Sequence, residues 1–188
     1  MAEPQDVLEA DLIEQVKAGR RKAFDRLVEP HAFRLLTLAR RMLASPSEAE
    51  EAVQTALASV WIGRERLDTA RALGPYLTTT VLNKCRDRLR RRKAARFLGF
   101  GYGLEEVIAT DHRPGPENTA ANREELMRVQ QEIECLPVRL REALILVTID
   151  GRSQREAAIL LGVSEKTIET RIYRARKRLR EKLNFPEG

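Results

Sequence analysis

The sequence has few of the residues that catalytic and metal sites usually require. It contains 2 cysteines and 2 histidines among 188 residues, and no Cys-x-x-Cys pair. Cys85 and Cys135 lie far apart, as do His31 and His112, whereas a zinc site needs more ligands at closer spacing. The pattern fits two ordinary thiols in a reducing cytoplasm better than a disulfide scaffold. We therefore expect neither a metal nor a cofactor, and a cytoplasmic protein.

Long apolar runs are also absent. No stretch of 18 apolar residues occurs, so the sequence predicts no membrane-spanning helix. The opening residues, MAEPQDVLEAD, are acidic and polar, unlike a secretory signal. Glycine (10 residues) and proline (8 residues) are scarce, while Leu, Ala, Arg and Glu dominate. This composition predicts an all-α protein, and its length favours two modest cores over one large core.

Charge is plentiful and unevenly distributed. The chain carries a net charge of +6, but residues 81–96 hold eight Lys or Arg and one Asp, and residues 171–182 hold seven Lys or Arg and one Glu. The remainder of the chain is therefore acidic, with a net charge of −7. A charge run is often only a solvated helix face. Two such runs with interleaved apolar residues instead suggest two contacts on one polyanion.

Apolar spacing predicts helices over most of the N-terminal half. The predicted ranges are 8–18, 23–28, 31–43, 46–62 and 76–96. Pro30 is expected to break or restart the second of these helices. His31, alone beside that break, is expected to be a surface histidine or a satisfied core histidine. The first helix is expected to turn its apolar residues inward, namely Leu8, Leu12, Ile13 and Val16.

The helix predicted to begin after Ser45 has an acidic first half. Ser45 is a suitable N-cap, and Pro46 occupies the first helical position. The acidic residues that follow could simply compensate the helix dipole, or they could form a docking face for a basic partner. Local sequence does not choose between these alternatives.

Residues 97–122 interrupt the helical pattern with glycines and prolines and predict a linker. The segment is not purely polar, because it includes apolar residues that favour burial, among them Phe100, Tyr102, Leu104, Val107 and Ile108. Its Gly-x-Gly-x-Gly pattern is not a nucleotide-binding loop, since no predicted strand precedes it.

The C-terminal part, residues 123–188, predicts four helices that end in a helix-turn-helix. Ser153 and Glu156 form a capping-box pattern, and Gly162 is placed to end that helix in a left-handed conformation. Ser164 caps the last helix. An ordinary helical hairpin would have the same spacing, but the basic excess after Arg171 favours a helix that lies near DNA phosphates.

The order of these parts resembles the small, two-domain sigma factors of bacterial RNA polymerase, the extracytoplasmic-function type. SPSEAEEAVQTALASVW is similar to the family's polymerase-docking helix, and YLTTTVLNKCRDRLRRRK to its promoter-melting helix. LPVRLREALILVTIDGRSQREAAILLGVSEKTIETRIYRARKRLREKL is similar to its second DNA-binding domain. The resemblance implies two small helical domains, residues 1–96 and 123–188, joined by a flexible linker, residues 97–122.

The resemblance also implies roles for particular residues. Polymerase binding falls to Glu50, Glu51 and Gln54. Contacts with the minus-ten promoter element fall to Asn83, Arg86, Asp87, Arg90 and Arg91, and capture of a flipped base to the connection 67–73. Contacts with the minus-thirty-five element fall to Lys166, Thr167, Thr170, Arg171, Arg174, Lys177 and Arg178.

Some positions depart from the family pattern. Ala52, Thr55 and Ser59 replace larger or charged residues on the docking helix. Glu169 is an acid on the helix expected to read DNA, and it could accept from a cytosine amine or pair with an arginine one turn away. We favour the pairing.

The function implied is that of a promoter-specificity subunit, without catalysis of its own, that binds core RNA polymerase and promoter DNA. An anti-sigma factor is an expected partner. A sigma-like decoy that binds only an anti-sigma factor is a second hypothesis, but a decoy needs no basic reading helix. A simple helix-turn-helix regulator is a third, and it leaves the first basic helix unexplained.

Overall fold

The computed structural model describes residues 4–98 and 120–183. Within these ranges the chain is helical and contains no strand, which confirms the all-α prediction. The elements are α1 (Pro4–Lys17), α2 (Arg21–Leu43), α3 (Pro46–Ile62), the 3-10 helix η1 (Arg64–Arg66), α4 (Leu73–Phe97), α5 (Ala120–Cys135), α6 (Val138–Thr148), α7 (Gln154–Leu161) and α8 (Glu165–Leu183). Most of the apolar residues predicted within the linker lie outside the described residues.

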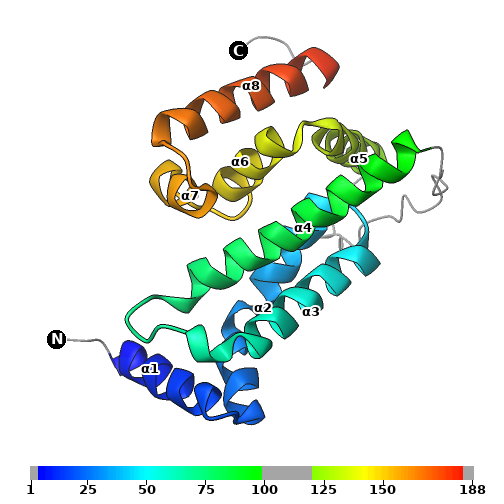
Figure 1. Cartoon of the computed structure of the whole chain (residues 1–188). Helices are drawn as coiled ribbons and strands as arrows, with labels where there is room; N and C mark the ends of the chain where they lie inside the picture. The colour runs from blue at the N-terminus through cyan, green and yellow to red at the C-terminus, as the bar shows by residue number, and fades with distance from the viewer. Residues whose placement is uncertain (1–3, 99–119, 184–188) are drawn as a thin grey trace.

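Helix α2 is central to the first half of the molecule, where it packs against α1, α3 and α4 (Figure 1). The apolar positions predicted for α1 are buried at Leu12, Ile13 and Val16. Leu8 is 51% exposed, so its predicted burial is wrong. It lies one turn before Leu12, nearer the N-terminal end of α1.

Helix α2 runs unbroken through Pro30, so the predicted break is wrong. Proline removes one backbone donor and costs about 3 kcal/mol inside a helix. Its ring lies on the exposed side here, while one apolar stripe continues on the buried side through Phe24, Leu27, Leu35 and Leu38. Each of these side chains contributes about 1.5–3 kcal/mol by burial, so the stripe outweighs the proline.

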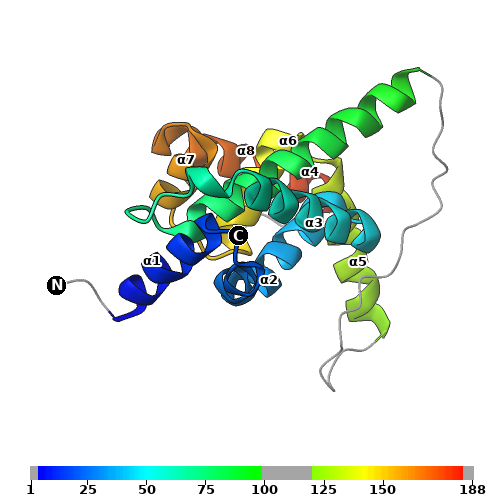
Figure 2. The same cartoon turned by 60° about the horizontal axis from the view of Figure 1, so that its bottom comes forward.

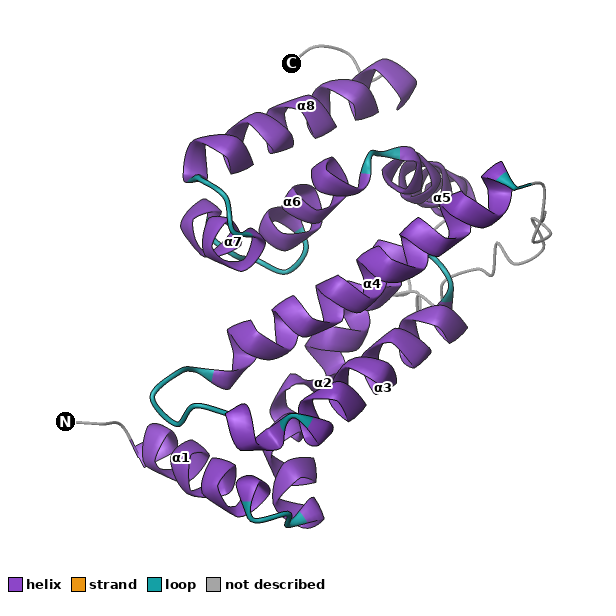
Figure 3. Ribbon diagram, in the orientation of Figure 1, coloured by secondary structure: helices purple, strands orange, loops and turns teal. Residues whose placement is uncertain are grey.

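The start of α4 also differs from the prediction. The helix begins at Leu73 rather than at Tyr76, and Pro75 lies in its first turn, where a missing N–H costs nothing. The threonine run that follows is accommodated through its hydroxyls. Thr78 donates to the Gly74 carbonyl and Thr80 to the Tyr76 carbonyl, each at 2.8 Å. Figure 3 shows in teal the loop that leads into the first turn of α4.

The second half consists of α5 to α8 and has the predicted helix-turn-helix. Ser153 Oγ accepts from the Glu156 N–H at 3.1 Å, and the Glu156 carboxylate accepts from the Ser153 N–H at 2.9 Å. Gly162 has a φ of +64°, a left-handed conformation that strains any residue with a Cβ. This reciprocal cap and the glycine turn fix where α7 begins and ends.

The two halves pack against each other. Helix α6 lies against α2, and α7 lies against α4. The buried core is continuous across this junction, since Ile145 and Leu146 belong to the same cluster as residues of α2 and α4. In Figure 2 the last turns of α4 extend beyond the helix bundle. At that end Phe97 is 89% exposed.

Candidate nucleic-acid interface

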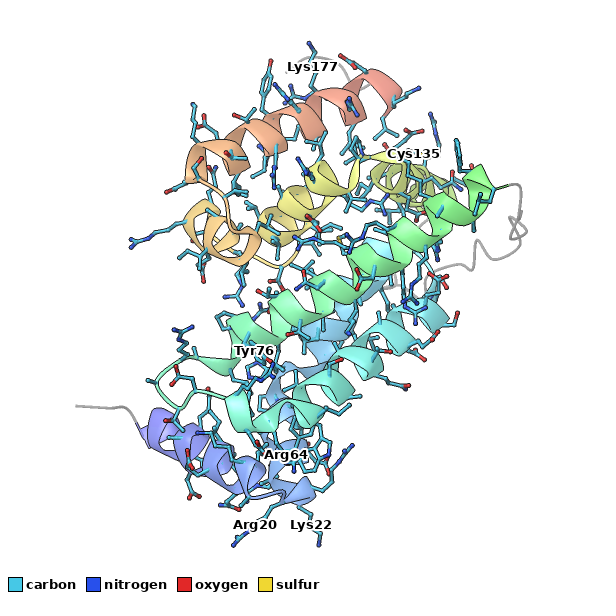
Figure 4. All side chains as sticks on the ribbon, viewed as in Figure 1. Arg20, Lys22, Arg64, Tyr76, Cys135 and Lys177 are labelled. Carbon is cyan, nitrogen blue, oxygen red and sulfur yellow. The ribbon has the colours of Figure 1, made fainter. Side chains whose placement is uncertain are left out.

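Helix α8 is held by one apolar face and presents a basic face to solvent. Ile168, Ile172 and Ala175 are buried against the rest of the second half. Helical geometry therefore directs the opposite face outward, and Lys166, Arg174 and Lys177 are exposed there. Lys177 points away from the molecule in Figure 4. This arrangement can place a row of cations along a DNA phosphate backbone.

The first turn of α8 is fixed by hydroxyl groups. Ser164 Oγ accepts from the Thr167 N–H at 3.2 Å and lies 2.8 Å from Thr167 Oγ1. Thr170 Oγ1 donates to the Lys166 carbonyl at 2.9 Å. Thr167, Thr170 and Arg171 are each half-buried. Thr170 lies on the exposed face, one turn from both Lys166 and Arg174, and Thr167 and Arg171 lie at the edge of that face. The remaining predicted residue of this group, Arg178, is exposed.

Glu169 pairs with a lysine rather than with an arginine. Lys166 Nζ lies 2.9 Å from Glu169 Oε2, and both side chains are largely exposed. The predicted ion pair of Glu169 is present, but its partner is Lys166 rather than an arginine. Lys166 lies three residues before Glu169, and residues three apart on a helix are neighbours. The pair partly neutralises the first cation of the exposed face.

One exposed residue of α8 was not predicted. Tyr173 is 65% exposed and lies on the same side of the helix as Lys166 and Lys177. The signal was present in the sequence, since Tyr173 is one turn after Thr170 and one turn before Lys177. An exposed aromatic ring among cations is suited to apolar contact with a base.

Helix α4 carries the residues predicted for the minus-ten element. Asn83 and Arg91 are exposed, and Arg90 pairs with Asp87. Arg86 donates to Asn83 Oδ1 at 2.8 Å. It also forms a two-pronged pair with the Glu142 carboxylate, its Nη2 lying 3.1 Å from Glu142 Oε2. The Arg86 side chain, which is predicted to contact DNA, is therefore paired with an acid of the second half in this structure.

The connection 67–73 is anchored at both ends and exposed between them. Leu67 and Leu73 are buried, and the Leu73 N–H donates to Glu9 Oε1 at 3.0 Å. The residues between them are exposed, and Arg71 pairs with Asp68 at 3.1 Å. A loop with fixed ends and an open middle is suited to holding an unstacked base.

The acidic face of α3 is paired within the molecule. Glu51 Oε1 lies 2.7 Å from Arg88 Nη2, and Glu50 Oε1 lies 3.0 Å from Arg40 Nη2. A hydrogen bond from Arg88 lowers the pKa of Glu51 below its usual value. Gln54 is exposed beside them. Since Glu50 and Glu51 remain largely exposed, they can exchange these arginines for those of a partner.

The two thiols and His31 are not among the residues of these surfaces. Cys85 is buried, and burial raises its pKa to about 12, so the thiol stays protonated. Cys135 is exposed. Burial also lowers the pKa of the half-buried His31.

Among the described residues no cluster of three metal-ligating side chains occurs. None of the described helices has the length and apolar character needed to cross a membrane.

Comparisons with known proteins agree with this geometry. The family model for Sigma-70 region 2 matches residues 27–95, and that for Sigma-70 region 4 matches residues 126–179. The sigma factor NccH of Alcaligenes xylosoxydans xylosoxydans is 33% identical over 89% of this chain and 90% of its own length. The sigma factor SigM of Mycobacterium tuberculosis H37Rv, of the extracytoplasmic-function type, is 34% identical over 94% of this chain and 85% of its own length.

A solved structure is similar over nearly the whole molecule. The structure of CnrH in complex with the cytosolic domain of CnrY has a TM-score of 0.67 and 30% identity, and the match covers 94% of this chain and 97% of that chain. The residues matched by each family model include a helix, α4 or α8, whose exposed face carries the cations described above. The chain therefore belongs to the sigma-70 family of RNA polymerase sigma factors, with relatives of the extracytoplasmic-function type.

Proposed function

We propose that the protein directs core RNA polymerase to promoters through two DNA-binding surfaces carried by separate domains. Residues 1–96 form the domain that docks on polymerase and contacts the minus-ten element. Residues 123–188 form the domain that reads the minus-thirty-five element, and residues 97–122 link the two. The protein has no catalytic step of its own and acts in the cytoplasm, where polymerase and promoter DNA are found.

The observation that carries the proposal is the orientation of α8. Its buried face is fixed by Ile168 and Ile172, so the cations of its outer face can enter a major groove together. Base contacts then come from the side chains near the start of the helix, and phosphate contacts from the basic tail. The residues proposed for the minus-thirty-five element are Lys166, Thr167, Thr170, Arg171, Arg174, Lys177 and Arg178.

Helix α4 supplies the second surface. Asn83 and Arg91 are exposed on it, and the exposed middle of the connection 67–73 lies just before its first turn. We assign Asn83, Arg86, Asp87, Arg90 and Arg91 to the minus-ten element. Cations beside an open loop favour the capture of a displaced strand, since exposed bases bind through stacking and polar contacts.

The acidic face of α3 is the proposed polymerase dock. Glu50, Glu51 and Gln54 are exposed in adjacent turns, and both acids are already paired with arginines of the same chain. A basic partner surface can replace those arginines with little loss, because exposed ion pairs are worth only about 0–1 kcal/mol.

An anti-sigma factor is the proposed regulator. CnrH, which is 30% identical to this chain, has been solved in complex with the cytosolic domain of CnrY. A protein of that kind would hold this chain inactive by covering its DNA-binding surfaces. Pull-down from cells of the same organism, with and without excess core polymerase, would identify such a partner as a competitor of polymerase.

Promoter choice in a reconstituted system tests the proposal. Arg171→Ala is expected to reduce transcription from promoters with a matched upstream element, while the matched control Arg155→Ala, on the exposed side of α7, retains it. Equal promoter choice for wild type and Arg171→Ala would refute the role of α8. A decoy would give no transcription with core polymerase at all, and a simple regulator would bind duplex DNA without needing polymerase.

A further inference from the structure

The exposed middle of the connection 67–73 is shaped by its own residues. The Ala70 N–H donates to Asp68 Oδ1 at 2.9 Å, and the Arg71 N–H donates to the Asp68 carbonyl at 3.2 Å. These bonds join residues two and three positions apart, so they form a turn without fixing that turn to the rest of the molecule. The orientation of the turn therefore depends on how the ends of the connection are held.

At its second end the connection is held by an acid of a distant helix. Ala72 precedes α4, and its methyl side chain has no oxygen that could cap the helix. The Leu73 N–H instead donates to Glu9 Oε1 of α1 at 3.0 Å, although the two residues are 64 positions apart. A carboxylate at this place also suits the positive end of the dipole of α4. Glu9 thus supplies the cap that the local sequence lacks.

A side chain of α2 packs against the same turn of α4. Gly74 leaves room for His31, since a Cβ at Gly74 would lie 3.3 Å from His31 Cε1. Burial lowers the pKa of His31, and the charge of the nearby Glu9 carboxylate opposes that shift. In Figure 1 and in Figure 2, α1 lies beside the loop that leads into α4. Side chains of α1 and α2 therefore meet at the first turn of α4.

We propose that Glu9 is a positioning residue for base capture. Glu9 lies outside the residues assigned above to DNA and to polymerase, and it acts by holding Leu73. The exposed residues 68–72 then keep one arrangement before DNA arrives. A loop that is already ordered avoids the entropy cost that a loose loop pays when it binds a displaced base. The role in base capture rests on the proposed function, whereas the ordering of the connection by Glu9 does not.

Amide hydrogen exchange in the free, full-length protein tests the ordering. Glu9→Ala removes the acceptor, and because Ala favours helix, α1 is retained. The amides of residues 68–73 are expected to exchange at least about tenfold faster in this variant, since a hydrogen bond to a charged acceptor is lost. The matched control Glu14→Ala, which removes an exposed acid of the same helix, leaves their exchange unchanged. Unchanged exchange in Glu9→Ala would overturn the proposal.

The conservative variant Glu9→Gln identifies the atom responsible. Its side-chain amide keeps a carbonyl oxygen as a hydrogen-bond acceptor but carries no charge. It is expected to restore most of the protection that Glu9→Ala loses. If Glu9→Gln exchanges as fast as Glu9→Ala, the hydrogen bond to Leu73 is not the cause and the proposal fails.

Transcription from two forms of one promoter tests the role in base capture. The promoter is a fragment recovered by run-off transcription, used fully paired and with a mismatched minus-ten region whose strands are already apart. Glu9→Ala is expected to reduce transcription from the paired form at least about fivefold and from the mismatched form less than about twofold, because only the paired form must unpair and unstack the captured base. Glu9→Gln is expected to behave nearly as wild type on both.

The two templates separate positioning from a general loss of stability. A destabilised protein would lose transcription from both forms equally, so equal losses would overturn the role in base capture. Wild-type transcription from the paired form by Glu9→Ala would overturn it as well. If the wild-type protein directs transcription from neither form, the proposed function fails, and the exchange result still decides whether Glu9 orders the connection.

Discussion

Glu51 offers a sharp test of the polymerase dock, because it already has a partner within the chain. Its side chain is 66% exposed and pairs with Arg88 at 2.7 Å. Glu51→Lys removes this pair and places a cation beside Arg88. An exposed pair contributes about 0–1 kcal/mol, so the fold is expected to lose no more than that. A loss of polymerase-binding free energy greater than about 1 kcal/mol must therefore come from the changed docking surface of α3.

The expected loss of binding is larger than the loss of stability. Replacing an acid that faces a basic partner with a lysine removes one attraction and adds one repulsion, which we expect to cost about 1–3 kcal/mol. This corresponds to about a 5- to 150-fold rise in the Kd for core polymerase. Titration of labelled protein with core polymerase measures the Kd, and urea unfolding measures the stability. Glu14→Lys, on the exposed side of α1, is the matched control.

A charge swap separates docking from internal pairing. Glu51→Lys combined with Arg88→Glu restores an ion pair between α3 and α4 but leaves the wrong charge at position 51. We expect the double variant to recover stability and to remain defective in polymerase binding. Recovery of the wild-type Kd by the double variant would refute the docking role and leave Glu51 with an internal role only.

Three further predictions concern the fold. Iodoacetamide at neutral pH is expected to modify Cys135 alone in the native protein and both thiols in urea, because burial raises the pKa of Cys85 to about 12; two rapid modifications of the native protein would contradict this. Burial lowers the pKa of His31, so the stability contributed by its neutral form is present above pH 6.5 and is lost as the pH falls toward the folded pKa. His31→Asn should therefore show a smaller difference in unfolding free energy between about pH 7.5 and 5.5. Ser153→Ala removes the cap of α7 and should destabilise the fold by about 1 kcal/mol in urea unfolding, while an unchanged midpoint would deny the cap its role.

The sequence predicted the ends of a helix correctly where capping residues next to the helix fix those ends. Ser153 with Glu156 predicted the start of α7, and Gly162 predicted its end, because caps and left-handed turns depend on residues a few positions apart. Ser45 predicted the start of α3 for the same reason. The break predicted at Pro30 is wrong for a physical reason. The proline does destabilise the helix locally, but burial of the apolar face of α2 on both sides of Pro30 contributes more free energy than the proline costs.

The contacts between the halves could not be predicted from the sequence. Nothing in the sequence near Glu142 of α6 or near Asp150, two residues after α6, indicates a charged partner, because the partners Arg86 and Arg34 lie 56 and 116 positions away. The same holds for Glu51, whose partner Arg88 belongs to the basic run of α4. The sequence showed which helices are basic or acidic. Only the packing of α6 on α2 and of α7 on α4 reveals which charges meet.

Run-off transcription tests the central claim most directly. Purified core RNA polymerase from the same organism is incubated with a library of genomic fragments, with and without this protein. We predict transcripts that depend on the protein and whose start sites share two upstream elements, and that are lost when α8 carries Arg171→Ala and Arg174→Ala. Absence of any protein-dependent transcript, from core polymerase that another sigma factor activates normally, would contradict the account.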